Sequence, residues 1–144
     1  MSVTHVDKDL DALTISMTAE FSAPVERVWQ VWADPRKLER WWGPPTYPAT
    51  FVEHDLSVGG RMHYYMTSPE GEKYHGCWTV VAVDAPHSLE VDDAFADDAG
   101  IANPDMPVTR MRVELHATAT GTRMTAVSTY ATLAGLQKVL DMGV

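Results

Sequence analysis

The chain has little of several features that would assign it to a specialised class of protein. Its 144 residues include one cysteine, Cys77, so no disulfide can form within the chain. No stretch approaches the roughly 20 apolar residues that cross a bilayer as a helix. The first residues also lack the basic and apolar segments of a signal peptide. These absences predict a cytoplasmic protein that binds no membrane.

Basic residues are scarce as well. Lysine and arginine total 11 against 20 aspartates and glutamates, which gives a formal net charge of −9 at pH 7. Such a field repels polyanions at long range. The sequence therefore predicts no nucleic-acid partner and favours neutral or cationic ones. With 45% hydrophobic and 22% charged residues, the chain has the composition of a globular protein, and we expect one domain over residues 1–144.

The hydrophobic pattern predicts a chain dominated by strands. Apolar and polar residues alternate over residues 13–21, which is typical of a half-buried strand. Pro24 suits the first turn of a helix that carries Val28 and Trp32, and Asp34 suits the N-cap of a second short helix. Six further strands are predicted, over residues 49–56, 61–67, 74–83, 88–95, 108–119 and 123–131. The expected order is one strand, two short helices and six strands.

The segment at residues 68–72 fits a three-residue hairpin loop with Gly71 in the left-handed conformation. This loop fixes the register of its two strands. Three pairs follow: Met66 with Tyr74, Tyr64 with Gly76, and Met62 with Trp78.

That register places Met62, Tyr64, Met66 and Trp78 on one face of the predicted sheet. Alternation gives similar faces later in the chain, consisting of Met111, Val113 and Leu115 in one strand and of Met124, Ala126, Ser128 and Tyr130 in the next. Methionine and aromatic residues fill protein cores routinely, so ordinary core packing is one interpretation. Hydroxyl groups on an otherwise apolar face favour the other, a cavity with a few orienting polar groups.

Two adjacent tryptophans, Trp41 and Trp42, end the second predicted helix before the Gly43-Pro44-Pro45 exit. Neighbouring residues on a helix point about 100° apart, so the two rings cannot share one stripe. We expect one ring to anchor the fold and the other to face a cavity.

No nucleophile, phosphate-loop or dinucleotide pattern is present. His54 is expected on the apolar side of its strand, either as a hydrogen-bonded core histidine or as a titratable group in a pocket. The hairpin register sets His63 opposite Cys77 on the outer face, with His75 nearby, which leaves a transition-metal site as an alternative to a solvated face. An acidic segment containing Asp92, Asp93, Asp97, Asp98 and Asp105 is expected to be a solvated loop rather than a calcium site. The sequence thus predicts no metal and no cofactor.

Several segments together resemble a known family. They are residues 23–29, 34–45, 58–62, 78–80, 103–111, 121–124 and 141–144. The combination resembles the SRPBCC or START-like helix-grip superfamily, and within it the subfamily named after activators of heat-shock-protein ATPase. The resemblance covers nearly the whole chain. It implies an α+β helix-grip fold, in which a curved antiparallel sheet grips a long C-terminal helix. Only the opening of that helix is recognisable, from about Ala134, and we expect more chain after Val144.

The resemblance also implies binding of a small hydrophobic or aromatic molecule between the sheet and the C-terminal helix. The predicted walls are Trp42, His54, Met62, Tyr64, Met66, Trp78, Phe95, Met106, Met111, Met124 and Ser128. We expect the loop at residues 100–107 to act as a gate, with Met106 at its tip. One alternative is an enzyme, such as a cyclase or hydrolase, with His54 and Tyr64 as acid and base. A co-chaperone that stimulates a heat-shock ATPase is another, and a homodimer also stays open.

Overall fold

The computed structural model describes residues 2–42 and 46–141. Within them, eight strands form one antiparallel sheet in the order β1-β2-β8-β7-β6-β5-β4-β3. The chain is α+β, as predicted. Its elements are β1 (Ser2–Asp9), β2 (Thr14–Phe21), α1 (Val25–Ala33), α2 (Pro35–Trp42), β3 (Ala49–His54), β4 (Arg61–Thr67), β5 (Lys73–Asp84), β6 (Ser88–Ala96), β7 (Val108–Ala117), β8 (Thr122–Tyr130) and α3 (Leu133–Asp141). None of the helices in these ranges is long and apolar enough to cross a membrane.

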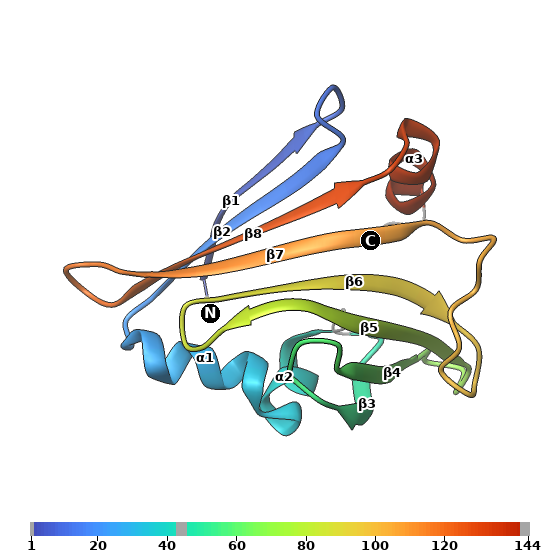
Figure 1. The fold of residues 1–144 in the computed structure, drawn as a ribbon, viewed down its shortest axis with the longest axis horizontal. Helices are drawn as coiled ribbons and strands as arrows, with labels where there is room; N and C mark the ends of the chain where they lie inside the picture. The colour runs from blue at the N-terminus through green and yellow to red at the C-terminus, as the bar shows by residue number, and fades with distance from the viewer. Residues whose placement is uncertain (1, 43–45, 142–144) are drawn as a thin grey trace.

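The helices occupy two different ends of the sheet (Figure 1). The helices α1 and α2 lie together near β3 to β6, whereas α3 lies at the far end of β8. Contacts agree with this view, because α2 packs on β3, α1 reaches β7, and α3 touches β8. The middle of the sheet therefore lies between two sets of helices.

Local chemistry explains the two short helices. Asp34 caps α2, since its Oδ1 accepts a hydrogen bond from the Arg36 backbone N–H at 2.9 Å. The helix α1 starts at Val25, one residue later than expected, because Pro24 holds extended backbone at the N-cap. Glu39 then ties α2 to the sheet by accepting the Phe51 backbone N–H at 2.7 Å. The predicted helix stop at residues 43–45 lies outside the described residues.

The hairpin between β4 and β5 has the predicted register. Met62 pairs with Trp78, Tyr64 with Gly76, and Met66 with Tyr74. Gly71 has the left-handed φ of +87° that the three-residue loop requires. The register is therefore confirmed, and it sorts the side chains of β4 and β5 between two faces.

The core lies on the face that we call inner, which carries Met62, Trp78, Val91, Met111 and Met124. All five side chains are buried in one apolar cluster together with residues of α1 and α2. A smaller cluster joins Tyr130 at the end of β8 to Leu136 of α3, with Leu13, Ile15 and Leu140 packed around it. The inner face is thus covered at both ends.

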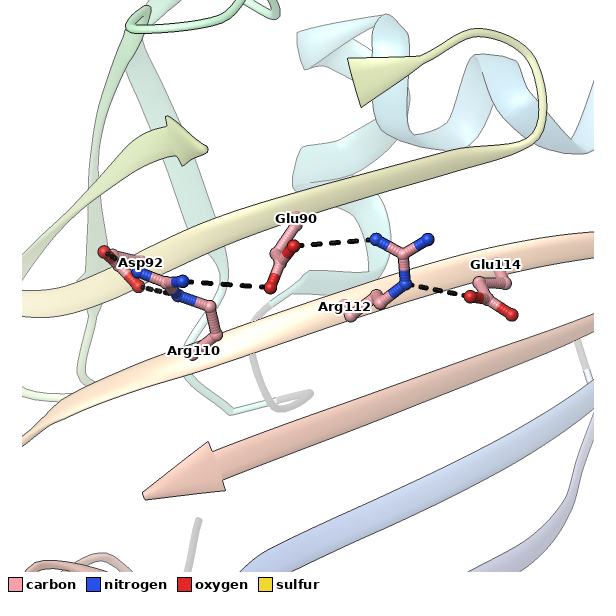
Figure 2. Close-up of polar contacts among 5 residues, drawn as sticks. All are labelled: Glu90, Asp92, Arg110, Arg112 and Glu114. Atoms are coloured by element: carbon pink, nitrogen blue, oxygen red, sulfur yellow. Dashed lines mark hydrogen bonds and ion pairs between the residues drawn. The ribbon is translucent and has the colours of Figure 1, made fainter. Parts of the chain in front are cut away.

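The outer face of β6 and β7 is polar (Figure 2). Arg110 forms an ion pair with Asp92 at 2.6 Å, and Arg112 pairs with Glu114 at 2.8 Å. Glu90 lies between the two arginines, within 3.9 Å of Arg110 and 3.5 Å of Arg112. These side chains, paired across β6 and β7 and within β7, are partly exposed, so this part of the outer face is a solvated surface.

The sequence-based prediction missed β1. Its segment offers only two apolar residues, Val3 and Val6, and Val6 is 54% exposed. A strand at the edge of a sheet is held by backbone hydrogen bonds to one neighbour, here β2, and needs no apolar alternation. The first expected strand is therefore the second strand of the sheet.

Candidate functional site

A hydrogen bond on the inner face joins two polar side chains from strands that are not neighbours. The hydroxyl of Tyr64, on β4, donates to Oδ1 of Asp93, on β6, at 3.0 Å. Gly76 of β5 pairs with Tyr64, and a Cβ at that position would collide with the phenol ring. Because glycine has no side chain, the ring can lie across β5 and reach the carboxylate. The three residues together form a polar bridge inside an apolar face.

The bridge changes the acidity of both partners. Burial raises the pKa of Asp93 to about 7, although the hydrogen bond from Tyr64 and the nearby indole N–H of Trp78 act in the opposite direction. Burial, followed by the charge of Asp93, raises the pKa of Tyr64 well above its ordinary value. Asp93 is therefore about half protonated at neutral pH, which is uncommon for an aspartate and typical of functional sites.

Trp41 and Trp42, as neighbouring helical residues, make different contacts. Trp41 packs edge-on against Trp32 at 4.6 Å and donates its indole N–H to the Val31 carbonyl at 3.1 Å, which anchors α2 to α1. Trp42 instead packs edge-on against Trp78 of the sheet, with ring centroids 4.7 Å apart. Its ring also lies 6.0 Å from that of Tyr64. Trp42 thus closes one side of the polar bridge.

Two indole N–H groups beside the bridge lack a hydrogen-bond partner. The Nε1 atoms of Trp42 and Trp78 are buried, and neither has a partner of good geometry among the described residues. Each is nevertheless close to the bridge, because Trp78 lowers the pKa of Asp93 and Trp42 lowers the pKa of Tyr64. Leaving such a donor unpaired costs about 1 to 3 kcal/mol, and an unpaired buried donor is rare in proteins.

The polar groups continue along one row of the sheet. Asp93 pairs with Thr109 of β7, which pairs with Tyr130 of β8. Burial raises the pKa of Tyr130, a hydrogen bond with Thr109 lowers it, and the charge of Asp93 raises it. In the next row, half-buried Ser128 pairs with Met111. Polar groups from four strands thus meet on the inner face between the two sets of helices.

The structure distributes the predicted wall residues among several environments. Met62, Tyr64, Trp78, Met111 and Met124 are buried in the main apolar cluster, and Trp42 and Met66 pack against it. Phe95 and Ser128 are half-buried on the same face.

The two remaining predicted wall residues are His54, which pairs with Met62 on the inner face, and Met106. His54 is half-buried, and its Nε2 lies 3.0 Å from the Trp32 carbonyl oxygen, so it makes the hydrogen bond of a core histidine. The ring of Phe51 contacts both His54 and Tyr64, and no hydrogen bond joins the latter two among the described residues. Met106 is half-buried and belongs to neither apolar cluster of described residues.

Sequence reasoning missed Asp93 as a candidate. It assigned Asp93 to a solvated acidic segment together with Asp92. In the structure the two lie on opposite faces of β6, with Asp92 paired to Arg110 outside and Asp93 inside. The available signal was the alternation of Leu89, Val91 and Asp93, which puts a carboxylate on an apolar face.

The first part of the expected gate covers the other face. Oδ1 of Asp97 accepts the backbone N–H groups of Ala99 and Ile101, each at 2.9 Å, and this closes a tight turn. Gly100 in that turn lies against Arg61 and His63, which are on the outer face of β4. The expectation that residues 100–107 close over the inner face is therefore wrong for this turn.

Beneath the turn, two histidines meet on the outer face. Nε2 of His63 lies 2.8 Å from Nδ1 of His75. Burial lowers the pKa of His63, and the neighbouring His75 and Arg61 lower it further. Burial also raises the pKa of the free Cys77 thiol. Among the described residues, no three histidine, cysteine or acidic side chains converge to hold a metal.

Two open hollows lie away from Asp93. One, of about 460 Å³, is bordered by residues 22–26, His87 and the turn around Gly121. The other, of about 300 Å³, lies between Phe21, the α1 side chains of Arg27, Val28 and Val31, and Trp41 of α2. Neither borders Asp93 or Tyr64, so the polar bridge lies on a packed and partly exposed face.

Comparison with known proteins identifies the family. Residues 22–143 match the profile of the Activator of Hsp90 ATPase homolog 1-like protein family. The chain belongs to this family. Its helix-grip fold and the sequence-based resemblance are therefore confirmed. A comparison with functionally curated proteins found no match.

Solved structures of similar proteins have the same fold. A crystal structure of protein Ms6760 from Mycobacterium smegmatis is 54% identical, with a TM-score of 0.90 over 99% of this chain and 87% of that one. An NMR structure of a protein from Arthrobacter aurescens is 49% identical, with a TM-score of 0.93 over 99% of this chain and 83% of that one. A Staphylococcus epidermidis protein is 27% identical, with a TM-score of 0.82 over 96% and 83%.

Proposed function

We propose that this protein binds a small hydrophobic or aromatic molecule on the inner face, between α1 and α2 on one side and α3 on the other. One observation carries the proposal: a desolvated carboxyl and two unpaired indole N–H groups lie together on an apolar face. Sites for small molecules combine mostly apolar walls with a few convergent polar groups. The family is compatible with this function because its fold suits a hydrophobic ligand.

The half-buried side chains identify where the molecule would lie. Phe95 is partly accessible beside Asp93 on β6, Met66 beside Tyr64 on β4, and Ser128 lies two strands away on the same face. Met62 and Met124 are fully buried, so they pack beneath this surface and are not accessible to a ligand. Covering the accessible apolar atoms stabilises a complex by about 25 cal/mol per Å².

A variant pair tests this placement. Ser128→Trp fills the inner face, whereas Thr129→Trp puts the same side chain on the exposed outer face of β8. Native mass spectrometry of each protein with tetralin, an uncharged bicyclic hydrocarbon, measures the bound fraction. We expect the wild type and Thr129→Trp to bind tetralin and Ser128→Trp to lose at least tenfold in affinity. Equal binding by all three proteins would exclude the inner face.

Asp93 also supports a second candidate function, acid–base catalysis on the bound molecule. A carboxyl with a pKa of about 7 can give and take protons at neutral pH. Asp93 and Tyr64 therefore replace His54 and Tyr64 as the pair proposed for an enzyme. Turnover of a candidate substrate that is lost in Asp93→Asn, while the substrate still binds, would favour this function.

The remaining predictions concern partners and location. Because the family is named after an activator of a heat-shock ATPase, we also propose a chaperone partner. Measuring whether the purified protein stimulates a heat-shock ATPase tests this proposal. We also retain the predicted homodimer and the cytoplasmic location as proposals. Sedimentation of the purified protein tests the first, and fractionation of the source cells tests the second.

A further inference from the structure

The polar groups of the inner face indicate which chemical class of molecule they bind. This inference rests on the proposed function. We propose that the bound molecule presents an uncharged oxygen acceptor, such as a carbonyl, to the indole N–H groups of Trp42 and Trp78 and to the protonated carboxyl of Asp93.

Two indole N–H donors beside the polar bridge are available to an acceptor. Trp78 is 1% exposed and Trp42 is partly buried, yet the Nε1 atoms of both are buried without a partner of good geometry among the described residues. An indole N–H can only donate, so it needs an acceptor. The two rings are 4.7 Å apart at 84° and border Tyr64 and Asp93. A single ligand oxygen in this corner can accept from more than one donor.

The charges around Asp93 favour an uncharged ligand. Among the described residues, no lysine or arginine forms an ion pair with Asp93, so nothing cationic would neutralise a bound anion. A bound amine would face the positive ends of two indole N–H dipoles and lose its own hydration in an apolar setting. An uncharged acceptor avoids both costs.

The protonated carboxyl of Asp93 can also donate a hydrogen bond to the ligand. Its raised pKa favours the protonated carboxyl up to neutral pH, and that form has one O–H to donate. Asp93 raises the pKa values of three titratable groups, which are Tyr64 from β4, Cys77 from β5 and Tyr130 from β8. All three are neutral near pH 7 because their pKa values are raised. Asp93 is therefore the group that controls the charge of the site in that range.

Three bicyclic probes with one ring system test the proposal: tetralin, 1-tetralone and the cation 2-aminotetralin. At pH 6, we expect 1-tetralone to bind at least tenfold more tightly than either of the others. In ¹H–¹⁵N spectra, the indole signals of Trp42 and Trp78 should move downfield with 1-tetralone and not with tetralin. Signals of the other three tryptophans serve as internal controls.

The pH dependence provides an independent readout. If the protonated carboxyl is the binding form, raising the pH from 6 to 8.5 weakens 1-tetralone binding by about 30-fold, because the competent fraction falls as Asp93 ionises. Asp93→Asn keeps an N–H donor and cannot ionise, so its affinity should not depend on pH. Asp92→Asn, the outer-face neighbour, should retain the wild-type dependence.

Tyr64→Phe provides an independent test if Asp93→Asn does not fold. Tyr64→Phe removes a hydrogen bond that lowers the pKa of Asp93, so the loss of binding should move to higher pH. A purely structural role of Tyr64 would not move that midpoint.

The outcomes separate the two proposals. Equal binding of tetralin and 1-tetralone, without indole shifts, overturns the acceptor proposal and leaves the binding function intact. Preference for 2-aminotetralin, or affinity that rises with pH, also overturns it. Failure of all three probes to bind the inner face overturns both.

Discussion

The hydroxyl of Tyr64 and the carboxylate of Asp93 are 3.0 Å apart although a whole strand separates their backbones. The absence of a side chain at Gly76 makes this contact possible. Tyr64, Gly76 and Asp93, on three adjacent strands, together produce one desolvated carboxyl group.

Substituting Gly76 tests the bridge directly. In Gly76→Ala the new methyl group collides with the Tyr64 ring, and we expect a loss of unfolding free energy of about 1 to 3 kcal/mol, typical of overpacking. The Asp93 pKa should rise because the Tyr64 hydrogen bond is weakened. Urea denaturation and ¹³C carboxyl titration measure the two effects. Gly71→Ala, in an open loop at φ +87°, is the control and should destabilise the protein without moving the Asp93 titration.

Asp93 predicts a specific dependence of stability on pH. Its pKa is about 7 in the folded protein and 3.8 in an unperturbed carboxyl, so the folded state favours the protonated form. Its contribution is complete below about pH 4 and is lost as the pH rises to about 7. Over this window the loss is on the order of 3 to 4 kcal/mol. Denaturation of Asp93→Asn at several pH values should show a flatter profile than the wild type, whereas a parallel profile would refute the assignment. Asp92→Asn is the matched control.

The outer-face histidines predict coupled protonation. His75 helps to lower the pKa of His63, so His75→Gln should raise the His63 pKa. The folded state disfavours protonated His63, and stability should therefore fall as the pH drops below 6.5, less so in the variant. NMR titration of the His63 ring measures the shift. His116→Gln, on exposed β7, should leave it unchanged, and an unmoved His63 pKa in His75→Gln would show that the two rings do not interact.

We expect Met124 to contribute to the stability of the fold and not to ligand binding. It is fully buried, and its Sδ accepts the Trp32 indole N–H at 3.4 Å. Met124→Ala should lower the unfolding free energy by about 2 to 5 kcal/mol, while the affinity for tetralin changes little in the folded protein. Val127→Ala, on the outer face of the same strand, should cost much less. A large loss of affinity with intact stability would place Met124 in the ligand wall instead.

The hairpin shows what sequence can predict. A loop of known length with glycine at the left-handed position sets the register, and the register determines which residues of β4 and β5 face the core. The alternation of Met111, Val113 and Leu115 correctly predicted the buried face of β7, because burial on one face imposes a period of two.

Three features of the structure were not predicted from the sequence. The edge strand β1 has almost no apolar alternation, since its pairing relies on backbone hydrogen bonds. Asp93 was assigned to an acidic loop because carboxylates are usually exposed; its alternation with Leu89 and Val91 indicates the inner face, but the hydrogen bond with Tyr64 depends on tertiary structure. The turn at Gly100 was misplaced because its position over His63 depends on contacts distant in sequence.

The central claim is that the inner face binds a small apolar molecule beside Asp93, and amide NMR during a tetralin titration tests it most directly. The account predicts saturable shifts clustered at Trp78, Asp93, Thr109 and Ser128, and their disappearance in Ser128→Trp but not in Thr129→Trp. Shifts that cluster instead around His87 and Gly121, or that persist in Ser128→Trp, would contradict it.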